Sequence, residues 1–270
     1  MSLSRAAASS AVPFALSPVT INNYGGTCHY TLPRFLSAFS DRETAPRPAA
    51  RALAQIRDLQ SFQDPNKPYI HLVDGGLSDN LGLRGVLDAL EELSALYSLG
   101  RPTPFDDVKR IIVFVVNSLS VPDTHWDESE RPPSNIVLLI KATGVPIDHY
   151  SYDTLETLKD MIAEWQKVKV LRNSAAFAAN KDPKIAELLR TPNIDLYGIE
   201  VSFSKLKDQE ERAYLNNLPT SFVLPPEAVD RLRAAAGKII LESPDLQRLL
   251  REAGARIVET MPASTPAVQH

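Results

Sequence analysis

The residues with the clearest chemical potential lie in the stretch YIHLVDGGLSDNLGLRG, residues 69–85. A short apolar run ends on Asp74, two glycines follow, and a polar triplet opens a helical pattern. At the carboxyl end of a sheet strand, a side chain projects into the crevice where α/β proteins bind ligands. Gly75 and Gly76 allow a sharp turn and the close approach of another group. Asp74 could therefore orient or deprotonate a nucleophile, bind a metal ion, or cap the turn and the next helix.

The elements that would position Asp74 follow from the spacing of apolar residues. Residues 69–73 lie between Pro68 and Gly75, which predicts a buried strand, and helical spacing begins near Leu81. Ser78, Asp79 and Asn80 have capping chemistry at the start of that helix. Residues 109–118 contain six consecutive apolar residues, which favours a strand covered on both faces of a parallel sheet. Strand, helix and strand in this order predict a crossover unit.

The remaining pattern predicts one α/β domain over residues 1–260 and a frayed tail over 261–270. Residues 19–30 favour an extended segment with a turn at Gly25 and Gly26, and residues 194–206 favour a late strand. Helices are predicted from about residue 49 and at residues 152–172, 208–216, 227–241 and 245–253. The mixed charge on the outer face of the 152–172 helix favours solvent over a lipid surface.

Composition excludes several classes of protein. A net charge of -4 with 33 acidic residues offers no basic face, so no nucleic-acid partner is expected. A single cysteine, Cys28, forms no internal disulfide and fits a reducing compartment. No apolar run reaches the roughly 18 residues that span a bilayer. The first residues loosely follow a signal-peptide pattern, but serines, Pro13 and Pro18 interrupt the apolar part, so we expect no signal peptide.

Two blocks of the sequence together resemble the patatin-like phospholipase family. LVDGG followed by SDNLGLRGVLDAL is similar to the family's aspartate block, and SRAAASSAVPFALSPV (residues 4–19) is similar to a segment upstream of it. The resemblance covers about residues 4–120. It implies a three-layer α/β/α fold and a Ser–Asp dyad in which Asp74 is the general base, held by the turn at Gly75 and Gly76. It also implies a lipid or acyl-ester substrate and no cofactor.

Two parts of the family pattern are missing from the sequence. None of the 11 glycines forms a Gly-x-Ser-x-Gly motif, and no glycine-rich segment is present to donate hydrogen bonds to an oxyanion. The resemblance therefore implies the C-terminal portion of a lipid acyl hydrolase, with a sheet that is incomplete at its N-terminal side and a serine on an upstream half. Such a chain is expected to be inactive alone, and cytoplasmic or membrane-associated through upstream segments. Lipid class, positional specificity and oligomeric state stay open.

Other hypotheses compete with this interpretation, besides the lipid-surface role that the mixed charge of the 152–172 helix disfavours. The first is a non-catalytic binding or interaction module, or a pseudoenzyme, on the same scaffold. In the second, Ser9, Ser10 or Ser78 replaces the missing nucleophile, although each has a simpler packing or capping role. The third pairs Cys28 with His29 as a thiol nucleophile, but neighbours in sequence are not a pair in space.

The fourth alternative is a metal hydrolase. No two histidines have the i, i+4 spacing of a helical metal site, and period 2 puts His71 and Asp74 on opposite faces of a strand. No metal is therefore predicted. The residues from which a metal site would have to be assembled are His71, Asp74, Asp79, His125 and His149.

Overall fold

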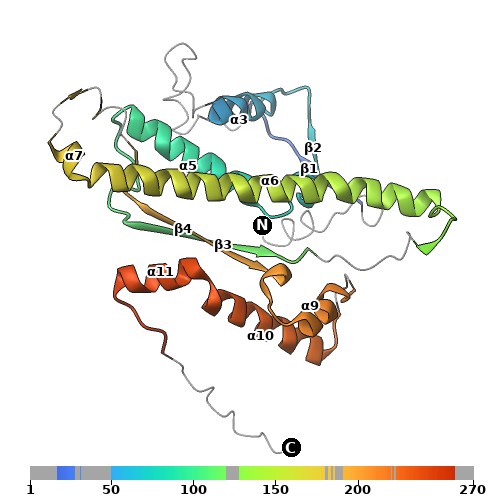
Figure 1. Ribbon diagram of the computed structural model, residues 1–270. Helices are drawn as coiled ribbons and strands as arrows, with labels where there is room; N and C mark the ends of the chain where they lie inside the picture. Colours follow the sequence, from blue (N-terminus) through green and yellow to red (C-terminus); the bar gives the residue numbers. More distant parts are fainter. Residues whose placement is uncertain are drawn as a thin grey trace, which may run out of the picture.

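The computed structural model describes residues 17–27, 31, 50–119, 128–179, 182–183, 185, 191–219, 221 and 223–258. Over these ranges the chain is a mixed α/β protein with two separate two-stranded sheets (Figure 1). None of the helices in these ranges is long and apolar enough to cross a bilayer. The predicted tail over 261–270 lies outside the described residues.

The first sheet is antiparallel and pairs β1 (Val19–Asn22) with β2 (Tyr69–Leu72). The connection between them contains α3 (Ala50–Ser61), which confirms the helix predicted from about residue 49. A turn at residues 25–27 follows β1, as predicted. The strand predicted at 69–73 is present, but it is not buried: Tyr69 is 60% exposed and Val73 is 45% exposed. Two short strands without a covering helix cannot bury their side chains.

The second sheet is parallel and pairs β3 (Arg110–Asn117) with β4 (Asp195–Ser202). The crossover between them contains the 38-residue helix α6 (Asn135–Arg172). The predicted crossover from β2 through α5 (Leu83–Ser98) to β3 is therefore wrong, because β2 and β3 belong to different sheets. Local sequence predicts a strand, but it does not specify which strand pairs with it.

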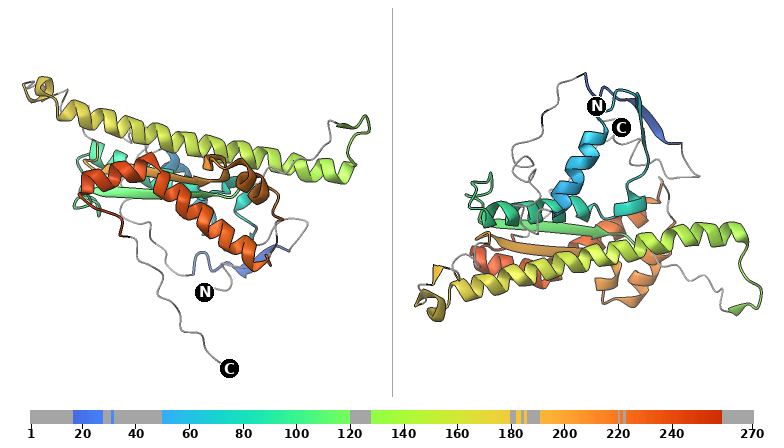
Figure 2. Two further views of the ribbon diagram at one scale, coloured as in Figure 1. Left: turned by 60° about the horizontal axis from the view of Figure 1, so that its bottom comes forward. Right: turned by 90° about the horizontal axis from the view of Figure 1, so that it is seen from above.

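One face of the β3–β4 sheet is covered by α5 and α6 (Figures 1 and 2). Buried residues recur every three or four positions along both helices, as the amphipathic pattern predicted. Gly198 of β4 lets α6 approach closely, since a Cβ atom at this position would lie 2.7 Å from Cδ1 of Ile162. The main buried residues of this core are Leu83, Leu87, Leu90, Leu93, Leu155, Leu158, Ile162, Trp165 and Leu196.

The other face is covered only beneath β4, by α10 (Pro226–Glu242) and α11 (Pro244–Ala253). Ile199 and Val201 pack there with residues of α10 and α9 (Gln209–Asn216). On β3 the same face is open: Ile112, Phe114 and Val116 are 41%, 50% and 69% exposed. Burial on both faces, which the apolar run of β3 predicted, thus holds for β4 and not for β3.

The late helices α9, α10 and α11 agree with prediction to within two residues at each end. α6 instead begins 17 residues before the predicted start at 152 and contains Pro146. Its N-terminal part runs past the end of the sheet (Figure 2). A proline inside a helix removes one hydrogen bond and normally ends or kinks it. This is why the sequence pattern placed the start of the helix after Pro146.

Candidate functional site

Asp74 lies two residues beyond the end of β2, where its carboxylate closes a tight turn. Its Oδ1 accepts a hydrogen bond from the backbone N–H of Gly76 at 2.7 Å. Its backbone carbonyl accepts a longer bond from Leu77 at 3.4 Å. The short helix α4 (Gly76–Asp79) starts at this turn. Oδ2 of Asp74 accepts no hydrogen bond from any part of the chain that the structure describes.

The two glycines after Asp74 have different roles. Gly75 has helical φ and ψ of -65° and -21°, and a Cβ there would meet no atom within 4 Å. Its conformation therefore does not require glycine, although the missing side chain leaves the approach to the turn open. A Cβ at Gly76 would lie 3.0 Å from Oδ1 of Asp74 and 3.0 Å from Oδ1 of Asn80. Because Gly76 has no side chain, the Asp74 carboxylate can approach the backbone of the turn closely enough to accept its N–H.

Asp79, and not Asp74, caps the start of α5. Its Oδ1 accepts the N–H of Leu83 and its Oδ2 accepts the N–H of Arg84, each at 3.0 Å. Two N–H groups that would lack an intrahelical partner are thereby satisfied. Among the three residues with predicted capping chemistry, Asp79 fulfils the role, and Asp74 is not needed for α5.

No nucleophile lies at Asp74 within the described ranges. Ser78 has its hydroxyl 3.5 Å from the carbonyl of Gly75, and His71 bonds across the first sheet to Thr20 at 2.9 Å. The described residues contain no cluster of three or more His, Cys, Asp or Glu side chains fit to hold a metal ion. Several sequence candidates lie outside the described residues: Ser9, Ser10, Cys28, His29 and His125.

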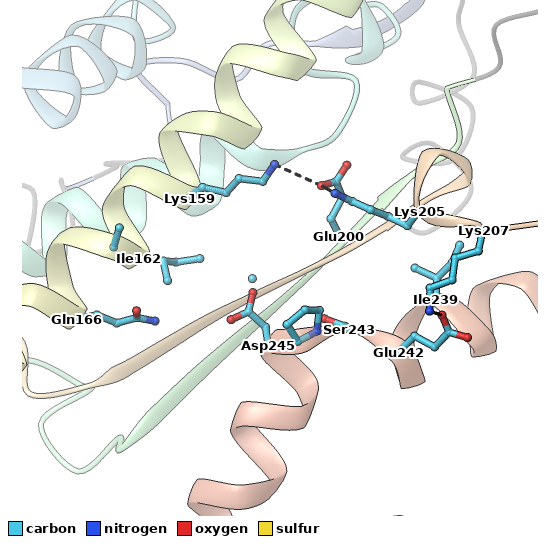
Figure 3. Close-up of a pocket in the computed structure, with 13 residues that line it drawn as sticks. Lys159, Ile162, Gln166, Glu200, Lys205, Lys207, Ile239, Glu242, Ser243 and Asp245 are labelled. Carbon is cyan, nitrogen blue, oxygen red and sulfur yellow. Dashed lines mark ion pairs between the residues drawn. The ribbon is translucent and has the colours of Figure 1, made fainter.

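A pocket lies away from Asp74, between α6, β4 and the junction of α10 with α11 (Figure 3). It encloses about 420 Å³. Oε2 of Glu200 lies 3.4 Å from Nζ of Lys159 and 3.2 Å from Nζ of Lys205. Burial lowers the pKa of Lys159, but the hydrogen bonds and charges of Glu156 and Glu200 outweigh this, so the pKa is above its ordinary value.

The charges around this pocket balance one another. Lys207 pairs with Glu242 at 2.9 Å, and the third carboxylate, Asp245, lies 3.0 Å from Arg248. The pair of Lys159 with Glu200 joins α6 to β4, and the pair of Lys207 with Glu242 joins the loop after β4 to α10. Pairs this exposed contribute little to stability. Sequence reasoning missed this pocket. Its signal was Glu200, a carboxylate between the apolar residues Ile199 and Val201 of β4, which a parallel sheet buries only when a cation faces it.

Comparisons with family models, with characterised proteins and with solved structures find no match to this chain. The geometry of the described residues is therefore the basis for any functional conclusion.

Proposed function

We propose that this chain is the base-carrying C-terminal portion of a patatin-like lipid acyl hydrolase, a serine esterase with a Ser–Asp dyad. The observation that carries the proposal is the turn at Asp74. One carboxylate oxygen is fixed by the N–H of Gly76 at 2.7 Å, and the other has no hydrogen-bond partner in the described part of the chain. A carboxylate with one held and one free oxygen is suited to accept a proton from a hydroxyl in a fixed direction.

The proposed reaction needs a serine from a segment outside these 270 residues. Oδ2 of Asp74 takes the proton of the serine hydroxyl while the serine oxygen attacks the ester carbonyl. Asp74 then gives this proton to the alcohol oxygen as the ester C–O bond breaks, which leaves the acyl-serine. Water next cleaves the acyl-serine, with Asp74 again as the base. The three-layer patatin-like sheet belongs to this proposal. Helices on both sides of β4 agree with it, and β3 has a second edge at which no strand of the described sheet pairs, so further strands could add there.

Alone, the chain is expected to have no esterase activity, because loss of the nucleophile in a serine hydrolase costs on the order of a million-fold in rate. The test incubates it with p-nitrophenyl butyrate and with a fluorophosphonate that labels activated serines. Serine labelling together with turnover that Asp74→Ala abolishes would contradict the absence of the nucleophile.

The positive test reads the encoding DNA upstream of the first codon. An in-frame Gly-x-Ser-x-Gly and a glycine-rich segment are expected there, and the longer protein should label with fluorophosphonate. Asp74→Asn should abolish labelling. The matched control is Asp79→Asn, which loses one capping hydrogen bond of α5 but lies outside the proposed dyad, so labelling should remain. Stop codons in all upstream frames would overturn the proposal.

A second candidate is a non-catalytic interaction module on the same scaffold. The observation in its favour is that Asp74 already has a structural task, since it closes the turn that starts α4. The two candidates differ in the need for an upstream half. If that half is expressed separately, the hydrolase proposal requires that mixing raises the melting temperature, whereas an independent module shows no shift.

A further inference from the structure

Asp74 and Gly75 form the only Asp-Gly dipeptide in the sequence, and no Asn-Gly dipeptide occurs. These two dipeptides are the ones that most readily form a succinimide ring, because glycine has no side chain to hinder attack of its backbone nitrogen on the preceding carboxyl or amide group. Each of the other glycines follows a residue that has neither group in its side chain. The single reactive dipeptide of the chain therefore coincides with the turn that starts α4.

The backbone nitrogen of Gly75 is free to react. Its N–H donates no hydrogen bond to any acceptor in the described ranges. In the same ranges, the peptide group between Asp74 and Gly75 is held only by the bond from the N–H of Leu77 to the carbonyl of Asp74, which is long at 3.4 Å. A Cβ at Gly75 would meet no atom within 4 Å. This peptide group can therefore turn its nitrogen toward the carboxyl carbon without displacing a packed neighbour.

The carboxyl group of Asp74 is oriented for this attack. Its Oδ1 accepts the N–H of Gly76 at 2.7 Å, which folds the side chain over Gly75, the residue between the two bonded groups. When the nitrogen of Gly75 attacks Cγ, negative charge develops on Oδ1, and a hydrogen-bond donor that is already in place stabilises this charge. Oδ2 accepts no hydrogen bond from the described part of the chain, so it can leave without breaking one.

We propose that Asp74 and Gly75 form a site of spontaneous isoaspartate formation. The nitrogen of Gly75 bonds to Cγ of Asp74, the bond from Cγ to Oδ2 breaks, and Oδ2 leaves as water with the carboxyl proton and the amide proton. Water then opens the succinimide ring. Cleavage between the nitrogen and Cγ restores aspartate, whereas cleavage between the nitrogen and the backbone carbonyl carbon of Asp74 gives isoaspartate. Apart from water, which is released and then taken up, no reagent takes part.

Isoaspartate changes the turn itself. The backbone then runs through Cβ and Cγ, which adds a methylene group to the main chain, and the carboxylate is attached directly to Cα. The hydrogen bond that closes the turn onto Gly76 cannot keep its geometry, so the start of α4 is altered as well. The reaction uses no serine and no substrate, so its failure and the failure of the proposed hydrolase are separate results.

The test incubates the full chain for several weeks at physiological temperature and pH. Samples are digested with an endoprotease that cleaves before aspartate but not before isoaspartate, and mass spectrometry follows the peptides. Cleavage before Asp74 should decline progressively. Cleavage before Asp79 should persist, because both oxygens of its carboxylate accept hydrogen bonds and its neighbour Asn80 has a side chain.

A parallel sample in guanidinium chloride gives the rate of conversion in the unfolded chain, where only the dipeptide itself contributes. Because the turn supplies a free nitrogen and a donor to Oδ1, the folded chain should convert at least as fast as the unfolded chain. Slower conversion in the folded chain, or no conversion, would overturn the proposal.

Two glycine variants assign the site. Gly75→Ala is compatible with the helical backbone at this position, and its methyl group meets no atom, so the protein should fold as wild type does by circular dichroism. The methyl group hinders the attack, so isoaspartate formation should slow at least tenfold. Gly85→Ala, whose methyl group also enters open space, keeps the Asp-Gly dipeptide and should convert as wild type does. Equal conversion of Gly75→Ala and wild type would place the isoaspartate elsewhere and overturn the proposal.

Discussion

The packing of α6 on β4 depends on the missing side chain of Gly198, and Gly198→Ala tests it. A Cβ at this position would lie 2.7 Å from Cδ1 of Ile162 and 3.7 Å from Cδ2 of Leu158. Carbon atoms pack best at about 3.5–4.0 Å, so the first contact is strongly repulsive. Ile162 is 8% exposed, and it can relieve the contact by turning its Cδ1 toward the pocket of Figure 3, which it lines.

The expected change in the free energy of unfolding for Gly198→Ala follows from two opposed effects. Overpacking a filled core typically costs about 1–3 kcal/mol. Alanine also restricts the unfolded chain relative to glycine, which returns about 0.4–1 kcal/mol. Because Ile162 can turn toward the pocket, the lower part of the first range applies. The free energy of unfolding should therefore fall by about 1 kcal/mol for Gly198→Ala, and the urea midpoint should fall by about 0.5 M. Circular dichroism during urea titration measures this change.

A double-mutant cycle with Ile162→Val assigns the effect to the predicted contact. Ile162→Val removes the offending Cδ1 atom and costs about 0.5–1.5 kcal/mol alone. Combined with Gly198→Ala it should be less destabilising than the sum of the single changes, by about 1 kcal/mol. Gly237→Ala is the control, because a Cβ there meets no atom within 4 Å, and in helix α10 it should stabilise by about 0.5–1 kcal/mol. A Gly198→Ala protein as stable as wild type, or strict additivity, would refute the reasoning.

Three further changes should alter the free energy of unfolding measured by urea titration. Asp79→Ala removes both cap hydrogen bonds of α5 and should cost about 1–2 kcal/mol, while Ser78→Ala should stay within about 0.5 kcal/mol. Burial and the hydrogen bond to a carboxylate of α11 raise the pKa of Tyr197 to about 12, so the folded state holds this proton more tightly than the unfolded state. Stability should fall as the pH rises from about 10 to 12, by about 1.4 kcal/mol at pH 11, and Tyr197→Phe should remove that part of the fall. Arg231→Lys should lower the urea midpoint, because lysine cannot reproduce the guanidinium fork on Glu211 that joins α9 to α10, and an unchanged midpoint would show that the fork contributes nothing.

The helices that the sequence predicted well are those whose ends carry a capping side chain, a proline or a glycine. α9 begins after Asp208, whose side chain accepts the N–H groups of Glu210 and Glu211. Prolines open α10 and α11, and Gly254 ends α11 in a left-handed conformation. Caps, prolines and terminal glycines act within a few residues, so a single sequence is enough to place them.

The features that the sequence did not predict depend on distant contacts. The apolar run of β3 predicted a strand, but the choice of β4 as its neighbour is decided across the 38-residue helix α6. The start of α6 was missed because Pro146 breaks the local pattern.

The same division applies to the candidate site. The turn at Asp74 is local and was predicted, whereas the pairing of Glu200 with Lys159 requires knowledge that α6 packs on β4. A nucleophile for Asp74 was absent from the sequence pattern, and none lies beside it in the part of the chain described.

The open side of β3 has a consequence for the behaviour of the protein in concentrated solution. Residues 111–116 form a six-residue segment of high β-propensity without charge, proline or glycine, and alternate side chains of it face solvent. Such a segment on a sheet edge is a template for intermolecular pairing and fibrillar aggregation. Aggregation of the isolated chain should therefore depend on this strand more than on global unfolding. Phe114→Lys should slow aggregation, because a charged side chain opposes pairing of this strand with another chain.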